Sequence, residues 1–155
     1  MKMPAVIKKV ALAVKPRGAR LQVAALPYRR REDGSVEVLL VTTRGTGRWM
    51  VPKGWPMPGK SLSEAAAQEA YEEAGVRGAA SPLELGRFRH EKTRFPAPPI
   101  QCTVAVFPMP VERELTRWPE HGQRTRRWFS LDDAARAVNS PALATIIAKV
   151  GQAKV

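Results

Sequence analysis

Apolar residues gather in short runs along this chain, and polar or glycine-containing segments separate the runs. Residues 21–28 (LQVAALPY) and 36–43 (VEVLLVTT) have the length of strands, and the polar segment RRREDGS between them is typical of a turn. We therefore expect a β-hairpin at the start of the fold. Further runs of this kind predict strands at 48–52, 83–89, 100–107 and 124–129.

The segment 62–74 (LSEAAAQEAYEEA) breaks this pattern. It contains no β-branched residue and is rich in alanine and glutamate, so its intrinsic propensity favours a helix. Ser61 and Glu64 have the spacing of a capping box, and Gly75 stands where a left-handed C-terminal cap belongs. Two further helices are predicted from LDDAARAV (131–138), with Ser130 as its N-cap, and from PALATIIAKV (141–150).

These elements fit one domain of the α/β class. The chain has 155 residues and no internal repeat, and its proline-rich pieces are too short to be linkers. We expect a mixed β-sheet sandwiched between helices over residues 20–150. A basic N-terminal arm over residues 1–19 precedes this domain.

Positive charge is concentrated near the N-terminus. The chain holds 26 Lys and Arg against 14 Asp and Glu, and nine of the basic residues lie within the first 31 positions, which contain no acid. Such an arm attracts phosphate-rich partners or remains a solvated tail. A nucleic-acid-binding module is an alternative that we do not favour, because no recognition-helix or aromatic stacking pattern accompanies the charge.

The number of cysteines and the length of the apolar runs indicate where in the cell the protein is expected. Cys102 is the single cysteine, which excludes an internal disulfide framework, and its apolar surroundings (IQCTVAVF) predict a small buried residue. Lysines interrupt the first apolar segment, so it does not resemble a signal peptide. No apolar run reaches the roughly 18 residues that a membrane-spanning helix needs. We expect a cytoplasmic protein with no membrane association.

Three carboxylates share one face of the predicted helix, because Glu69, Glu72 and Glu73 are related as i, i+3 and i+4. Like charges at these spacings repel one another, and no Lys or Arg lies between 61 and 76 to pair with them. One interpretation is a solvated acidic stripe. The other is a bound Mg²⁺, with Mn²⁺ as a substitute, because hard cations take carboxylate oxygens and retain waters that a phosphate can replace.

The same stretch resembles the Nudix box of the Nudix hydrolases, G-x5-E-x7-R-E-U-x-E-E-x-G-U, where U is a bulky apolar residue. The flanking segments RWMVPKG and RRWFSLDDAARAV also look like pieces of this family, so the resemblance covers residues 20–140. The positions that match the box are Gly54, Glu69, Glu72, Glu73, Gly75 and Val76.

Three positions depart from the box. Lys60 stands where the family has Glu, Gln68 where it has Arg, and Ala70 where it has a bulky apolar residue. In the family, that Glu and Arg support the loop and helix, while the later glutamates hold the metal. A contact of Lys60 with Gln68 or with a glutamate is expected to substitute for the lost pair. The alternative is a decayed site that binds a ligand, as a regulatory protein would, without cleaving it.

The resemblance implies metal-assisted hydrolysis of a phosphoanhydride bond in a nucleoside-diphosphate-linked or polyphosphorylated small molecule. It assigns Glu69, Glu72 and Glu73 as metal ligands and catalytic residues, with the carbonyl of Gly54 as a further ligand. The general base stays open: it is Glu72, Glu73 or an acid outside the box, for which the candidates are Glu112, Glu114 and Glu120.

The segment VPKGW resembles the form found in hydrolases of diadenosine polyphosphates and of diphosphoinositol polyphosphates. Substrates with many phosphates need cations beyond the metal. An exposed Trp55 would favour a nucleotide over an inositol. The residues expected to bind substrate phosphates are Arg44, Arg48, Lys53, Lys60, Arg89 and Lys92.

Overall fold

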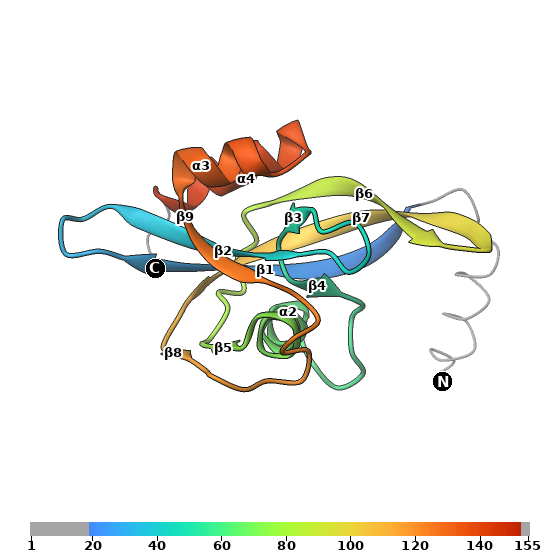
Figure 1. Cartoon of the computed structure of the whole chain (residues 1–155), viewed down its shortest axis with the longest axis horizontal. Coiled ribbons are helices and arrows are strands. Elements are labelled where there is room, and N and C mark those ends of the chain that lie inside the picture. Colours follow the sequence, from blue (N-terminus) through green and yellow to red (C-terminus); the bar gives the residue numbers. More distant parts are fainter. Residues whose placement is uncertain (1–18, 153–155) are drawn as a thin grey trace, which may run out of the picture.

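The computed structural model describes residues 19–152, so the predicted arm over 1–19 lies almost entirely outside the described residues. A seven-stranded sheet forms the centre of this part of the chain (Figure 1). Its main order is β3-β2-β1-β7-β6, while β4 pairs with β1 and β9 with β2. The strands of the sheet are β1 (Arg20–Arg30), β2 (Val36–Thr42), β3 (Trp49–Met50), β4 (Lys53–Gly54), β6 (Gly86–Arg94), β7 (Ala97–Pro110) and β9 (Arg126–Ser130).

The sheet is mixed, as predicted. Strands β1 and β2 form the expected antiparallel hairpin, in which Tyr28 lies opposite Val38. Strands β1 and β7 run parallel along nine positions, from the pair Arg20 and Cys102 onward. The remaining ladders of the sheet are antiparallel, and β5 (Val76–Arg77) with β8 (Arg113–Glu114) forms a separate small ladder.

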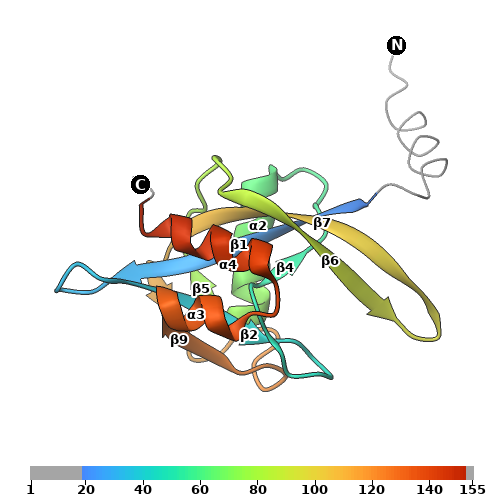
Figure 2. The same ribbon diagram turned by 90° about the horizontal axis from the view of Figure 1, so that it is seen from above.

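Helices cover both faces of the sheet, which confirms the predicted sandwich. α2 (Leu62–Glu69) and the turn that follows it pack on one face, while α3 (Leu131–Ala137) and α4 (Pro141–Val150) pack on the other (Figures 1 and 2). Successive side chains of β1 point to opposite faces of the sheet, so Val23 belongs to the core under α2 and Ala24 to the core under α3 and α4. No helix in residues 19–152 is long and apolar enough to cross a membrane.

The predicted helix starts are confirmed. The Ser61 hydroxyl accepts a hydrogen bond from the Glu64 amide at 3.1 Å, and the Glu64 carboxylate accepts one from the Ser61 amide at 2.8 Å. Ser130 caps α3 through the amide of Asp133. These local bonds satisfy amides that the first helical turn leaves free, which is why sequence spacing alone revealed them.

The helix predicted over 62–74 changes its geometry at residue 70. α2 ends at Glu69, and η1 (Ala70–Ala74) continues it as a π-helical turn. The amide of Gly75, whose φ is 67°, bonds to the carbonyls of Ala70 and Tyr71 and closes the turn. The wider turn keeps Ala70 and Ala74, both fully buried, on the same side against the sheet.

Two strands are longer than predicted. β6 and β7 extend through RFPAPP, which we expected to be a loop, until Arg94 lies opposite Ala97. The prolines of this part of β7 are tolerated because β1 pairs with β7 only from Cys102 onward, so one side of the strand is an edge there. The strand predicted at 48–52 is shorter than expected, since β3 covers Trp49–Met50 only, and the chain resumes as β4 after Pro52. Cys102 is buried, as expected.

Candidate active site

β4 distributes its two residues over the two faces of the sheet. Gly54 lies opposite Val23 and therefore faces α2, while Lys53 lies opposite Ala24 and faces the other layer. A β-carbon at Gly54 would overlap the carboxylate of Glu69. The absence of a side chain at this position is what allows the helix carboxylate to lie against the loop backbone.

Two of the three predicted carboxylates are buried together. Glu69 is 9% and Glu73 is 8% exposed. Burial, followed by the nearby charges of Glu73, Glu72 and Glu120, raises the pKa of Glu69 to about 8. Burial also raises the pKa of Glu73 to about 7, although Arg124 and Lys53 oppose that rise. Ionisation of both carboxyl groups is therefore disfavoured in the metal-free protein, first by burial and then by neighbouring acids.

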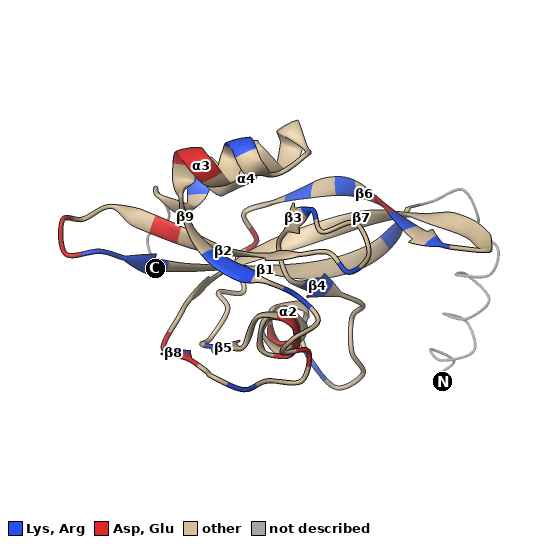
Figure 3. Ribbon diagram, in the orientation of Figure 1, with Lys and Arg blue, Asp and Glu red and all other residues tan. Residues whose placement is uncertain are grey.

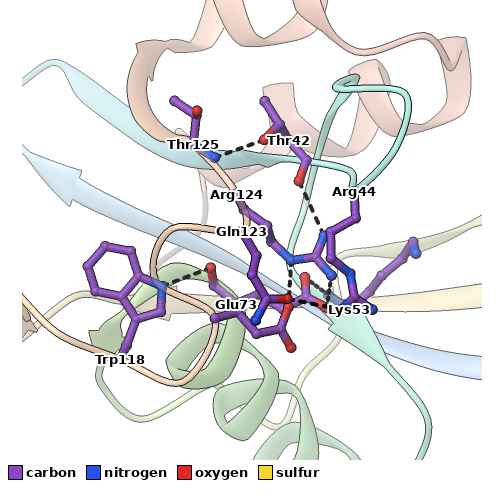
Figure 4. Close-up of polar contacts among 9 residues, drawn as sticks. Thr42, Arg44, Lys53, Glu73, Trp118, Gln123, Arg124 and Thr125 are labelled. Atoms are coloured by element: carbon purple, nitrogen blue, oxygen red, sulfur yellow. Dashed lines mark hydrogen bonds and ion pairs between the residues drawn. The ribbon is translucent and has the colours of Figure 1, made fainter.

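Arg124 joins this cluster to the loop before β9. Its guanidinium lies 3.4 Å from a carboxylate oxygen of Glu73 and 2.8 Å from one of Glu120, and it also donates to the carbonyl of Thr42 at 3.2 Å (Figure 4). The amide of Lys53 donates to the other oxygen of Glu73 at 3.4 Å. Glu73 thus lies between the β4 backbone and Arg124.

Of the three acids considered outside the box, Glu120 is the one that lies at the cluster. Its amide donates to the carbonyl of Glu72 at 3.0 Å, and its carboxylate pairs with Arg124. Glu114 accepts a hydrogen bond from the indole of Trp128, and Glu112 stands beside the small ladder of β5 and β8. Sequence spacing gave no means of separating these three.

The Glu72 side chain is hydrogen-bonded to the preceding turn of its own helix. One of its carboxylate oxygens accepts a hydrogen bond from the side chain of Gln68 at 2.8 Å. As placed, no three Asp, Glu, His or Cys side chains within residues 19–152 converge as metal ligands. Glu69 and Glu73 are thus both buried, whereas one carboxylate oxygen of Glu72 is engaged by Gln68.

The donor set nevertheless fits a hard divalent cation. Buried carboxylates whose pKa values are raised by desolvation and by neighbouring acids are stabilised when a cation binds to them, and carboxylate and carbonyl oxygens are the ligands such ions take. Because Gly54 has no side chain, the loop backbone lies directly against the Glu69 carboxylate.

Basic residues lie on the opposite face of the sheet from Glu69. His90 pairs with Cys102 and Lys92 with Ile100, which places both on the face of Lys53, whereas alternation puts Arg89 on the other face. Burial lowers the pKa of Lys53, and burial together with Lys53 and Lys92 lowers that of His90 to about 4. Figure 3 shows the basic residues along β6 and at β4.

The other predicted cations are dispersed. Arg44 donates to the side chain of Gln123 at 3.0 Å, beside the loop that carries Arg124. Arg48 is exposed before β3. Lys60 and Gln68 line a hollow of about 460 Å³ at the start of α2, away from Lys53. Trp55 is half-buried, with the guanidinium of Arg20 5.0 Å from its ring centre.

The model of the NUDIX domain matches residues 19–150 of this chain. The chain belongs to the Nudix family. Its sheet, flanking helices and box residues are arranged as a single Nudix fold, and the prediction made from Gly54, Glu69, Glu72 and Glu73 is confirmed at the level of the family.

Related proteins support the same family assignment. Nudix hydrolase 16, mitochondrial, of Arabidopsis thaliana is 32% identical over 136 residues, covering 80% of this chain and 75% of that protein. Diphosphoinositol polyphosphate phosphohydrolase 3-alpha of Mus musculus is 36% identical over 127 residues, covering 79% and 71%. The structure of the C. elegans Ap4A hydrolase shares the fold, with a TM-score of 0.61 at 18% identity over 87% of this chain and 98% of that one.

Proposed function

We propose that this Nudix protein is a Mg²⁺-dependent pyrophosphohydrolase that cleaves a phosphoanhydride bond in a polyphosphorylated small molecule. The observation that carries the proposal is the buried pair of Glu69 and Glu73, held between the Gly54 backbone and Arg124. Two carboxylates with raised pKa values, one against a carbonyl-bearing loop and one against an arginine, form an environment in which a divalent cation relieves repulsion.

In this proposal Glu69, Glu72, Glu73 and the carbonyl of Gly54 hold Mg²⁺, with Mn²⁺ as a substitute. When bound, the ion polarises the phosphate and lowers the pKa of a bound water. Glu73 is held by Arg124 and by the Lys53 amide, so its carboxylate keeps a fixed position next to Glu69.

We assign Glu120 as the group that orients and deprotonates the attacking water. Its carboxylate is 2.8 Å from Arg124, and the proximity of its charge raises the pKa values of both Glu69 and Glu73. Its backbone bond to Glu72 fixes the distance between the loop and the helix. A general base must reach the site without itself being a metal ligand, and Glu120 meets both conditions in this proposal.

Lys53, His90 and Lys92 provide the part of the site that binds phosphates beyond the scissile bond. They share one face of the sheet, and the charges of both Glu73 and Lys92 act on the pKa of Lys53, so Lys53 connects this basic face to the acidic cluster. Diadenosine polyphosphates and diphosphoinositol polyphosphates, the substrate classes named for two of the similar proteins, carry several phosphates that suit such a face.

A substrate panel with Mg²⁺ tests the proposal. It contains diadenosine polyphosphates, diphosphoinositol polyphosphates, ADP-ribose and 5′-triphosphorylated RNA, each assayed with Mg²⁺ and with EDTA. We expect turnover of one of the first two classes that EDTA abolishes. Binding without turnover across the whole panel would instead identify a ligand-binding regulator. The same assay in cytoplasmic and organellar fractions tests our proposal that the protein acts in the cytoplasm.

A further inference from the structure

The π-helical turn that carries Glu72 and Glu73 exposes its last carbonyls to one segment, residues 115–126. The Glu120 amide donates to the carbonyl of Glu72 at 3.0 Å, and the indole of Trp118 donates to that of Glu73 at 3.2 Å. Arg126 donates to the carbonyls of Ala74 at 2.9 Å and Gly75 at 3.1 Å. Four consecutive carbonyls thus receive donors from a segment more than forty positions away along the chain.

Trp118 and Arg126 also hold each other. The guanidinium of Arg126 lies 4.1 Å from the centre of the Trp118 ring and donates to the carbonyl of Leu115 at 2.6 Å. A β-carbon at Gly75 would overlap the Trp118 ring, so the glycine that ends the turn also admits the indole. Helix ends without such partners leave several carbonyls unsatisfied, and here the Trp118 and Arg126 side chains and the Glu120 amide satisfy them.

The same segment contains Glu120 and Arg124, whose side chains reach the acidic cluster. Its attachment at Trp118 and Arg126 therefore determines where Glu120 and Arg124 lie relative to Glu73. We propose that Trp118 and Arg126 are positioning residues of the active site, which align the helix carboxylates with the loop acid and arginine. This inference rests on the proposed function for its effect on turnover, but the attachment itself does not depend on it.

The variant Trp118→Phe removes the indole donor and keeps an aromatic ring. Its matched control is Trp128→Phe, because Trp128 packs against the core under α2 but donates its indole N–H to Glu114 instead of to a carbonyl at the end of η1. Arg126→Lys keeps the charge but loses the forked donor pattern, and Arg127→Lys, on the neighbouring position of β9, is its control. The guanidinium carbon of Arg127 lies 4.4 Å from the centre of the Phe129 ring, and Arg127 makes none of the contacts to η1 described above.

Three measurements separate the outcomes. Hydrogen exchange of the amides at 72–75 without metal should accelerate about tenfold in Trp118→Phe and Arg126→Lys. Mn²⁺ affinity measured by calorimetry without substrate should fall about tenfold, and kcat should fall about tenfold with KM within twofold. Neither control variant should change these quantities, even where it lowers the melting temperature as much as Trp118→Phe or Arg126→Lys does.

An unchanged hydrogen-exchange rate of the amides at 72–75 in Trp118→Phe would show that Trp118 does not attach the segment 115–126 to η1, whatever the protein catalyses. Faster exchange with unchanged Mn²⁺ affinity and kcat would show that the contacts stabilise the fold only, and would overturn the positioning role. A wild-type chain that neither binds Mn²⁺ nor turns over the panel would remove the proposed function and the positioning role together, while faster exchange in the variants would still establish the structural attachment.

Discussion

The carboxylate of Glu69 occupies the space that a β-carbon on residue 54 would fill. Two residues fifteen positions apart are therefore fitted to each other through the absence of one side chain. The backbone of Gly54 does not have a positive φ, so the requirement for glycine arises from this contact and not from its dihedral angles.

The variant Gly54→Ala tests this relationship. The new methyl group should displace Glu69, lower kcat by about 10²-fold and destabilise the fold by about 1–3 kcal/mol. Steady-state assays and urea unfolding measure the two effects. In the double variant Gly54→Ala with Glu69→Asp, the shorter carboxylate should restore part of the stability but not the activity. Equal destabilisation in the single and double variants would show that the overlap is not the cause.

Replacement of Glu73 by Gln tests the acidic cluster. The amide oxygen can still accept from the Lys53 amide, but one charge is removed beside Glu69. We expect kcat to fall about 10²-fold or more, which corresponds to about 3 kcal/mol of transition-state stabilisation. Thermal stability without metal should stay level or rise, because repulsion is relieved. Turnover close to that of the wild type would refute the assigned role of Glu73.

The stability of the metal-free protein should fall as pH rises. The pKa of Glu69 is about 8 in the folded chain, against 4.5 for an unperturbed glutamate, so the folded state binds the proton more tightly than the unfolded state. Stability is therefore highest below pH 4.5 for this group and is lost progressively up to pH 8, by an amount on the order of 2 kcal/mol after solvent screening.

Urea unfolding in EDTA at pH 5, 6.5 and 8 measures this decline, and Glu69→Gln should flatten it. Added Mg²⁺ should stabilise the wild type more at pH 8 than at pH 5, because the ion competes with protons for the same oxygens. A metal-free protein whose stability is constant across this range would contradict the raised pKa of Glu69.

The two faces of β6 should contribute unequally to substrate binding. Lys92 shares the face of Lys53, whereas Arg89 lies on the other face. Lys92→Gln should raise KM about fivefold, close to 1 kcal/mol, with a smaller change for Arg89→Gln. The Lys92 effect should shrink at high salt, where charges are screened. Equal changes in the two variants would indicate that both faces contact substrate.

Local signals in the sequence predicted local structure well. The capping box at Ser61, the cap at Gly75 and the first hairpin depend on residues only a few positions apart, so their spacing is visible in the sequence. The two-residue strands β5 and β8 were not predicted, because two residues carry no periodicity.

The site was predicted in part for the same reason. Glu69 and Glu73 belong to one helix, so their shared face followed from helical spacing. The pairing of Arg124 with Glu73 joins residues 51 positions apart, and no local pattern indicates it. The hydrogen bond that turns Glu72 toward Gln68 depends on a side-chain rotamer, which spacing does not determine.

The parallel pairing of β1 with β7 has a consequence for how the chain is synthesised. The nine-position ladder from Arg20 and Cys102 to Tyr28 and Pro110 joins the first strand to one made much later, and both strands lie at the middle of the sheet. Contacts between such distant segments slow folding, because a long loop must close before they form. During synthesis, the edge of β1 that pairs with β7 therefore stays without its partner, while the other edge can pair with β2, until the Nudix box and β7 have left the exit tunnel of the ribosome.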